Sequence, residues 1–288
     1  MKCIRILAAM LCTFLLCSCA QSSPGEKINI GEISKETDAE ETVSTVNVVF
    51  SANSAIMDGD GASFSDSVFT VTKGGSYSLS GELNGCIVVD VPKKEKVELI
   101  LCGLTVESNT TSAVYVKSVD KITFYLEKDT VNTLTDGDSY CIDDSAVPSA
   151  CIYSADDVEI CGEGQLLVYA KCRNGIQTKN DLRIKGGNIT VTAPKNALKG
   201  KDNVVITAGN VKITGAKDGI KSDNEAESGR GNVTITGGNV DIYCQDDGIQ
   251  AYRSITINGE ATVKIEAGDR SLNCDGTVSV VKGCLVEK

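Results

Sequence analysis

Acidic and amide side chains gather at both ends of one short apolar segment that recurs in the C-terminal half of the chain. If neighbouring repeats stack, these carboxylates lie close together and repel one another unless a cation lies between them. Oxygen ligands without histidine or cysteine select a hard ion, and outside the cell calcium fits that description. Asp and Asn before Gly also make good turns without any ion, so both interpretations stay open. The predicted Ca²⁺ ligands are Asp218, Asp246 and Asp247 before the segment and Asp202, Asp223 and Asn224 after it.

A second set of side chains, one per repeat, is suited to sugars. Each follows an inward-facing apolar residue and therefore points outward. Aromatic rings pack on flat sugar faces, amides hydrogen-bond to hydroxyls, and lysines pair with uronate carboxylates. An outward strand position is also polar by default, so an ordinary solvated face is the alternative. The predicted ligand-binding residues are Tyr115, Tyr153, Gln177, Lys199, Lys221 and Gln250, with Tyr252 and Arg253 beside the last of them.

A repeat positions both sets. Its units start at Asn174, Asn196, Asp218 and Asp247, so the period is 22, 22 and then 29 residues, the last including a seven-residue insert at 225–231. A period of this length without a helical pattern indicates stacked β-structure, in which each unit buries its apolar face against its neighbours.

Within each unit, three short runs alternate apolar and polar residues, which places one face inward and one outward. Glycine–asparagine pairs between the second and third runs indicate turns. We therefore predict an all-β fold, a right-handed single-stranded parallel β-helix with three short strands and about 22 residues per coil. The alignment places Ile184, Ile206, Ile235 and Ile257 in one interior column.

The N-terminus reads as a targeting signal. Lys2 and Arg5 precede an apolar stretch too short to span a membrane, which ends in Leu-Cys-Ser-Cys at residues 16–19. This ending resembles the lipobox of bacterial lipoproteins; an ordinary secretory signal is the alternative. We predict a lipoprotein signal peptide at 1–18, a lipid-anchored acidic linker at 19–45 beginning with acylated Cys19, and the β-helix domain at 46–288. The protein would then be extracytoplasmic and held on the bacterial cell membrane by its lipid anchor alone.

Composition excludes some classes of protein. The chain of 288 residues has 39 acidic and 28 basic residues, a net charge of −11, and neither histidine nor tryptophan. Such a surface repels nucleic acid, so we exclude that partner. We expect the protein to be a monomer. Nine of the 13 cysteines follow residue 19. Their odd number and small inward positions favour free, buried thiols over a disulfide scaffold.

Five segments carry a resemblance to a known family. The chain resembles bacterial exported carbohydrate-binding proteins with a β-helix of the pectate-lyase superfamily. The resemblance implies calcium binding and recognition of plant cell-wall polysaccharides, including acidic pectic ones, without established catalytic activity. The segments are NTLTDGDSY (132–140), SACIYSADDVEICGEGQLLVYA (149–170), NGIQTKNDLRIKGGNITV (174–191), DGIKSDN (218–224) and DGIQAYRSITING (247–259).

We consider two main functions, and a purely structural surface protein is a third alternative. The first is surface-anchored, calcium-dependent, non-catalytic binding of plant cell-wall polysaccharide, of acidic pectic and cellulosic glycans. The second is a calcium-dependent pectate-type lyase in which Lys199, Lys221 or Arg253 removes the proton next to a uronate carboxylate. Neighbouring carboxylates favour the charged form of an ammonium and so oppose a lysine base. We therefore favour binding and assign no catalytic residue.

Overall fold

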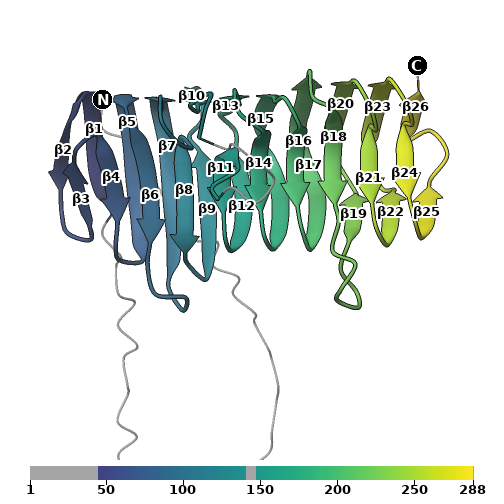
Figure 1. Cartoon of the computed structure of the whole chain (residues 1–288), viewed down its shortest axis with the longest axis horizontal. Helices are drawn as coiled ribbons and strands as arrows, with labels where there is room; N and C mark the ends of the chain where they lie inside the picture. The colour runs from purple at the N-terminus through teal and green to yellow at the C-terminus, as the bar shows by residue number, and fades with distance from the viewer. Residues whose placement is uncertain (1–44, 141–146, 288) are drawn as a thin grey trace, which may run out of the picture. The chain divides into compact units, whose positions relative to one another are not determined.

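The computed structural model describes residues 45–140 and 147–287, and its regular elements are β-strands. None of these described elements is a helix long and apolar enough to cross a membrane. Figure 1 shows the strands stacked along the long axis of the picture, from β1 to β4 at one end to β24, β25 and β26 at the other. The predicted signal peptide, Cys19 and almost all of the linker lie outside the described residues.

The larger sheet has 16 strands. Along its main path lie β2 (Ser54–Asp58), β1 (Val46–Ala52), β5 (Gly75–Asn84), β7 (Lys96–Glu107), β10 (Val131–Thr135), β13 (Gln165–Tyr169), β15 (Asp181–Thr192), β17 (Asn203–Thr214), β19 (Asn232–Ile235), β22 (Ser254–Ile257) and β25 (Thr277–Val280). Off this path lie β9 (Lys121–Leu126), β12 (Asp157–Gly162), β20 (Asn239–Cys244), β23 (Thr262–Ala267) and β26 (Leu285–Glu287).

The smaller sheet has ten strands and holds the first apolar segment of each repeat. In order they are β24 (Leu272–Cys274), β21 (Ile249–Ala251), β18 (Asp218–Ser222), β16 (Asn196–Gly200), β14 (Asn174–Thr178), β11 (Ala150–Ser154), β8 (Val114–Ser118), β6 (Cys86–Asp90), β4 (Val68–Val71) and β3 (Ala62–Ser65). Only the β1–β2 and β3–β4 pairs among the described strands are antiparallel, and both lie at the N-terminal end.

The parallel register follows the sequence repeat. Ile184 pairs with Ile206, Ile206 with Ile235, and Ile235 with Ile257, and all four side chains are fully buried. This confirms the predicted interior column. β-Branched side chains at alternate positions fit the pleat and fill one continuous core between the two sheets.

The predicted fold class, a right-handed single-stranded parallel β-helix with three short strands per coil, is wrong. The second and third runs of the repeat join into single strands of 12 residues in β15 and β17. Pairing of β7, β9, β12, β15, β13 and β10 closes a parallel ring of six strands, with further strands added to it. The smaller sheet is separate from this ring.

Glycine chemistry explains the error. Gly187 and Gly209 were expected to end a strand, and both have a positive φ, of 87° and 95°. In the structure they form a bulge, because the register shifts after Ile184 and recovers at Asn188 without breaking the strand. In the next repeat, the corresponding Gly237 and Gly238 do separate two strands, β19 and β20.

The cysteine prediction is right in part. Cys86, Cys151, Cys244 and Cys284 are free and buried, as expected. Burial raises the pKa of the Cys151 thiol well above its ordinary value, which suits an inert core residue. Cys172, however, is disulfide-bonded, so the chain is not wholly reduced.

Candidate functional site

The outward column on the smaller sheet exists in the predicted register. Tyr115 pairs with Tyr153, Tyr153 with Gln177, and Gln177 with Lys199. The pairing continues through Lys221 to Gln250. One residue per repeat therefore faces the same side over six strands, and Asn273 of β24, which the sequence reasoning missed, extends the column by one more.

The two tyrosines do not form an open aromatic platform. Tyr153 is only 1% exposed, and its ring meets that of Tyr115 edge-on with centroids 5.7 Å apart. Burial, followed by the nearby Tyr115, raises the pKa of Tyr153 to about 12. Tyr115 stays half-buried, with the Lys117 ammonium 5.6 Å from its ring centroid. Of these two tyrosines, Tyr115 and not Tyr153 is accessible to a ligand.

The middle of the column is held by internal contacts. The Gln177 side-chain oxygen accepts hydrogen bonds from Ser149 Oγ at 2.9 Å and Asn174 Nδ2 at 2.6 Å. The Lys199 ammonium donates to Asp223 Oδ2 at 2.7 Å. In the described part of the chain, by contrast, the side chains of Lys221 and Gln250 make neither hydrogen bond nor ion pair, which leaves them available to a ligand.

A cavity of about 310 Å³ opens where the column is free. Three of the predicted ligand-binding residues, Lys221, Gln250 and Tyr252, line it. The other lining residues are Ser222, Asp223, Glu225, Ala251, Asn273 and Asp275. We call this cavity the lysine pocket. Arg253 lies next to it, with its guanidinium 6.0 Å from the Tyr252 ring and its Nε donating to the Arg230 carbonyl.

The predicted metal ligands separate into two places, because a five-residue strand lies between the start and the end of the segment. At the start, side-chain oxygens of Asp246, Asp247 and Asp269 lie within 4.8 Å of one another. Asp218 is buried nearby, and its Oδ1 is 3.5 Å from the Asp247 amide nitrogen. Asp269 was missed, although it follows Asp246 by one repeat and its amide bonds to the Asp246 carbonyl.

This carboxylate cluster is only partly neutralised. Asp247 is 5% exposed, and its Oδ1 accepts no hydrogen bond. Arg270 Nε lies 3.3 Å from that oxygen, and Lys217 Nζ lies 3.3 Å from Asp246 Oδ2. A buried carboxylate oxygen without a hydrogen-bond donor is costly, and a hard cation is a chemically suitable partner.

The remaining predicted ligands lie elsewhere. Asp202 is buried at the far end of the segment. It accepts a hydrogen bond from Asn224 Nδ2 at 2.6 Å and forms an ion pair with Arg230. Asp223 is engaged with Lys199 beside the lysine pocket. These three residues do not join the carboxylate cluster.

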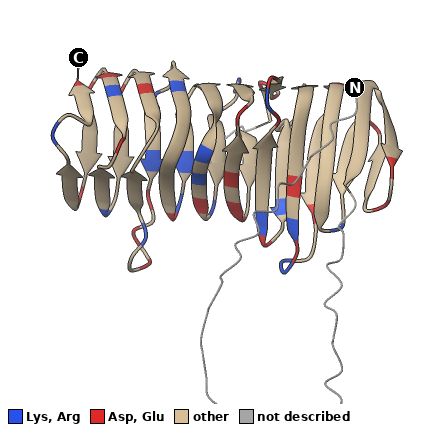
Figure 2. Cartoon of the chain, turned by 180° about the vertical axis from the view of Figure 1, so that it is seen from behind, with Lys and Arg blue, Asp and Glu red and all other residues tan. Residues whose placement is uncertain are grey.

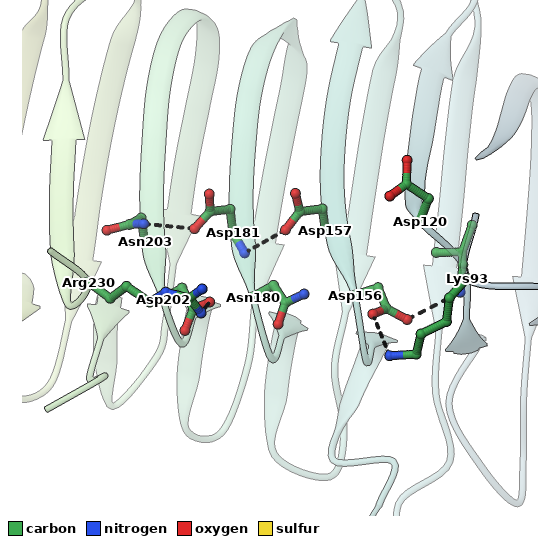
Figure 3. A pocket seen from close by; sticks show the side chains of 10 residues that line it. Lys93, Asp120, Asp156, Asp157, Asn180, Asp181, Asp202, Asn203 and Arg230 are labelled. Atoms are coloured by element: carbon green, nitrogen blue, oxygen red, sulfur yellow. Dashed lines mark hydrogen bonds and ion pairs between the residues drawn. The ribbon is translucent and has the colours of Figure 1, made fainter. Parts of the chain in front are cut away.

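A larger cavity of about 470 Å³ adjoins Asp202. Figure 3 shows two rows of Asp and Asn side chains crossing successive repeats, with Lys93 at one end and Arg230 at the other. We call it the Asx groove. It is lined by Lys93, Val119, Asp120, Asp156, Asp157, Asn180, Asp181, Asp202, Asn203 and Arg230.

Comparison with known proteins gives consistent results. Residues 65–284 match the family model described as carbohydrate-binding domain-containing protein. A protein of that description from Acetivibrio thermocellus is 45% identical over 229 residues, which cover 78% of this chain and 80% of that protein.

A solved structure is similar as well. It is described as the polysaccharide lyase-like protein from C. thermocellum, gadolinium derivative, and it superposes with a TM-score of 0.81 at 40% sequence identity. The match covers 85% of this chain and 100% of that one. Together with the matched length of the family model, these similarities show that the chain belongs to the family of carbohydrate-binding domain-containing proteins.

Proposed function

We propose that this carbohydrate-binding protein binds acidic, pectic plant cell-wall polysaccharide at the lysine pocket, without catalysis. The observation that carries the proposal is the unengaged ammonium of Lys221 beside Gln250 and Tyr252 in one cavity. The ammonium pairs with a uronate carboxylate, the amide with a hydroxyl, and the aromatic face with a sugar ring.

A calcium ion at the carboxylate cluster is the second part of the proposal. The donor set fits a hard cation, because Asp246, Asp247 and Asp269 offer only oxygen and Asp247 Oδ1 has no hydrogen-bond donor. The similar solved structure is a gadolinium derivative, and gadolinium is likewise a hard cation that prefers oxygen ligands. When bound, the ion would offset repulsion among the carboxylates and so fix the strand start that leads to Gln250.

The test of the lysine pocket is calorimetric titration with hexagalacturonate. Lys221→Ala and Tyr252→Ala should each weaken binding, the tyrosine by about fivefold for a lost ring contact of about 1 kcal/mol. Lys212→Ala and Lys264→Ala are matched controls, because both lysines are exposed on the larger sheet on either side of Asp241. Equal losses from the two pairs would mean that overall charge, and not this pocket, holds the ligand.

The lyase is the second candidate, favoured by the description of the similar structure as polysaccharide lyase-like. Of the proposed bases, Lys199 is bonded to Asp223 and Arg253 to backbone carbonyls, which leaves Lys221. Absorbance of unsaturated products during incubation with polygalacturonate decides between the two. Product that disappears in Lys221→Ala would replace binding by lyase chemistry.

Anchoring at the bacterial cell surface completes the proposal. It rests on the Leu-Cys-Ser-Cys ending of the apolar N-terminal stretch. Labelling of cells with a radioactive fatty acid should mark the wild type and not Cys19→Ser. Equal labelling of both proteins would contradict acylation at Cys19.

A further inference from the structure

The lysine pocket holds more unpaired negative than positive charge. Three carboxylates line it beside the Lys221 ammonium. Asp223 is neutralised by Lys199, whose Nζ lies 2.7 Å from Asp223 Oδ2. The exposed side chains of Glu225 and Asp275 have neither an ion-pair nor a hydrogen-bond partner in the described part of the chain. One free ammonium therefore shares the cavity with two free carboxylates, and this limits how many acidic groups a ligand can bring.

The strand register fixes where these charges lie along a bound chain. Lys221 pairs with Gln250, and Gln250 with Asn273, so one ammonium and two amides form a row across three repeats. Tyr252 and Asp275 follow the two amides by two residues and line the same cavity. Neighbouring parallel strands are about 4.8 Å apart, so about 10 Å across the repeats separates the Lys221 strand from the strand before Asp275. A glycan that runs across the repeats from Lys221 therefore meets amide and aromatic groups first and a carboxylate next.

The other free carboxylate, Glu225, belongs to the seven-residue insert at 225–231, the loop between β18 and β19 in Figure 1. Figure 2 shows this loop extending beyond the ends of the neighbouring strands and carrying both acidic and basic residues. Its start is fixed by Asn224, which is 1% exposed and whose Oδ1 accepts two backbone amide hydrogen bonds from the insert, each at 3.1 Å. Its end is fixed by the ion pair between Arg230 and Asp202. The insert is thus anchored on both sides, and it holds Glu225 at the pocket.

A ligand carboxylate is attracted by Lys221 and repelled by Glu225 and Asp275. Two like charges about 5 Å apart repel, and at exposed positions such an interaction changes affinity by up to about fivefold. The cavity of about 310 Å³ lies at the lower end of the usual range for small-molecule sites, so it takes a short stretch of chain. A uronan with all carboxyls free brings several like charges into that stretch. A methyl ester removes the charge of its carboxyl and keeps oxygen acceptors, to which the amides of Gln250 and Asn273 can donate.

We propose that Glu225 and Asp275 are specificity-determining residues, which make the lysine pocket select galacturonan with a free carboxyl between methyl-esterified neighbours. The free carboxyl pairs with Lys221, and the uncharged esters lie near the two carboxylates without repulsion. The inference rests on the proposed binding of acidic pectic glycan at this pocket, and it adds the ester pattern that the pocket prefers.

Calorimetric titration of the full chain at one fixed calcium concentration tests this preference with three hexagalacturonate probes. One has all carboxyls free, one has alternate carboxyls methyl-esterified, and one is fully esterified. The wild type should bind the alternate ester most tightly and the full ester most weakly, because the full ester offers Lys221 no carboxylate. Glu225→Gln and Asp275→Asn, which remove a charge and keep the shape, should each tighten binding of the free acid by about two- to fivefold. Neither variant should change the affinity for the alternate ester by as much.

Glu266→Gln is the matched control, because Glu266 is an exposed acid on the larger sheet, where it pairs with Tyr243, and its replacement changes the net charge equally. It should leave all three affinities unchanged. Tightest binding of the free acid by the wild type would overturn this inference and leave the proposed function intact. Equal tightening by Glu266→Gln, or none by Glu225→Gln and Asp275→Asn, would also overturn it. Binding of none of the three probes would overturn the proposed function itself.

Discussion

Calcium should raise the melting temperature of the protein, and replacing Arg270 by glutamine should enlarge that rise. Oxygens of Asp246, Asp247 and Asp269 lie within 4.8 Å of one another, where two unit charges repel by about 3.5 kcal/mol at an effective dielectric constant of about 20 and by about 0.9 kcal/mol in water. Arg270 offsets part of this repulsion, because its Nε is 3.3 Å from both Asp247 Oδ1 and Asp269 Oδ2.

The magnitude follows from linkage. A cation that binds only the folded chain, present at about 100 times its Kd, stabilises by about 2.7 kcal/mol. A domain of about 150–250 residues gains roughly 2–4 °C per kcal/mol, so the melting temperature should rise by about 5–11 °C. Arg270 occupies the same oxygens that the cation needs. Arg270→Gln should therefore melt below the wild type without calcium and gain more than the wild type with it.

The assay is differential scanning calorimetry in millimolar calcium and in chelator. Asp247→Asn and Asp269→Asn should lose most of the calcium effect. Asp241→Asn is the matched control, because Asp241 is an exposed acid on the larger sheet between Lys212 and Lys264. Unchanged melting of both wild type and Arg270→Gln would refute the site. A smaller calcium effect in Arg270→Gln than in the wild type would refute the competition.

Two further predictions concern stability. Ile206→Ala should lower the free energy of unfolding by about 2–5 kcal/mol in urea titration, because Ile206 is fully buried between two neighbouring isoleucines, whereas the half-buried Val205→Ala should lose much less; equal losses would contradict the interior column. Burial raises the pKa of Glu159, but hydrogen bonds and charge from Lys185 and Lys121 lower it overall, so the stabilisation is present above the ordinary glutamate pKa and lost as pH falls through the folded value. Glu159→Gln should therefore be less stable than the wild type at pH 7, with a difference that shrinks on acidification; a constant difference would refute the assignment.

The sequence predicted the register of the fold better than its strand boundaries. Alternating β-branched residues define inward columns, since a slip of one residue would expose every one of them. Ile184 and Ile206 therefore align as expected. The strand count failed at Gly187 and Gly209, because a glycine with positive φ serves a turn and a bulge equally well. Only the pairing of flanking residues distinguishes the two.

The site was predictable where it depended on the repeat and unpredictable where it depended on other segments. The outward column from Tyr115 to Gln250 follows from spacing alone, but the burial of Tyr153 does not. Asp202 and Asp247 are both predicted calcium ligands, but they lie at opposite ends of the five-residue segment, which is about 16 Å long. The ion-pair partner of Asp202, Arg230, comes from the insert at 225–231, which has no counterpart in the other repeats.

The repeat has a consequence for how binding specificity is distributed. Each unit contributes one side chain to the outward column, and three successive repeats contribute two each to the Asx groove, so a substitution changes one position of an extended surface and not a whole site. Charge is then set locally. Arg230 neutralises Asp202 in the Asx groove, whereas Lys221 in the lysine pocket has no ion-pair partner among the described residues. Since neighbouring positions are about 4.8 Å apart, a glycan bound along either surface would contact several of them at once. Two surfaces with different charge balance are therefore compatible with one repeated backbone, because the side chains that differ point outward and leave the interior columns unchanged.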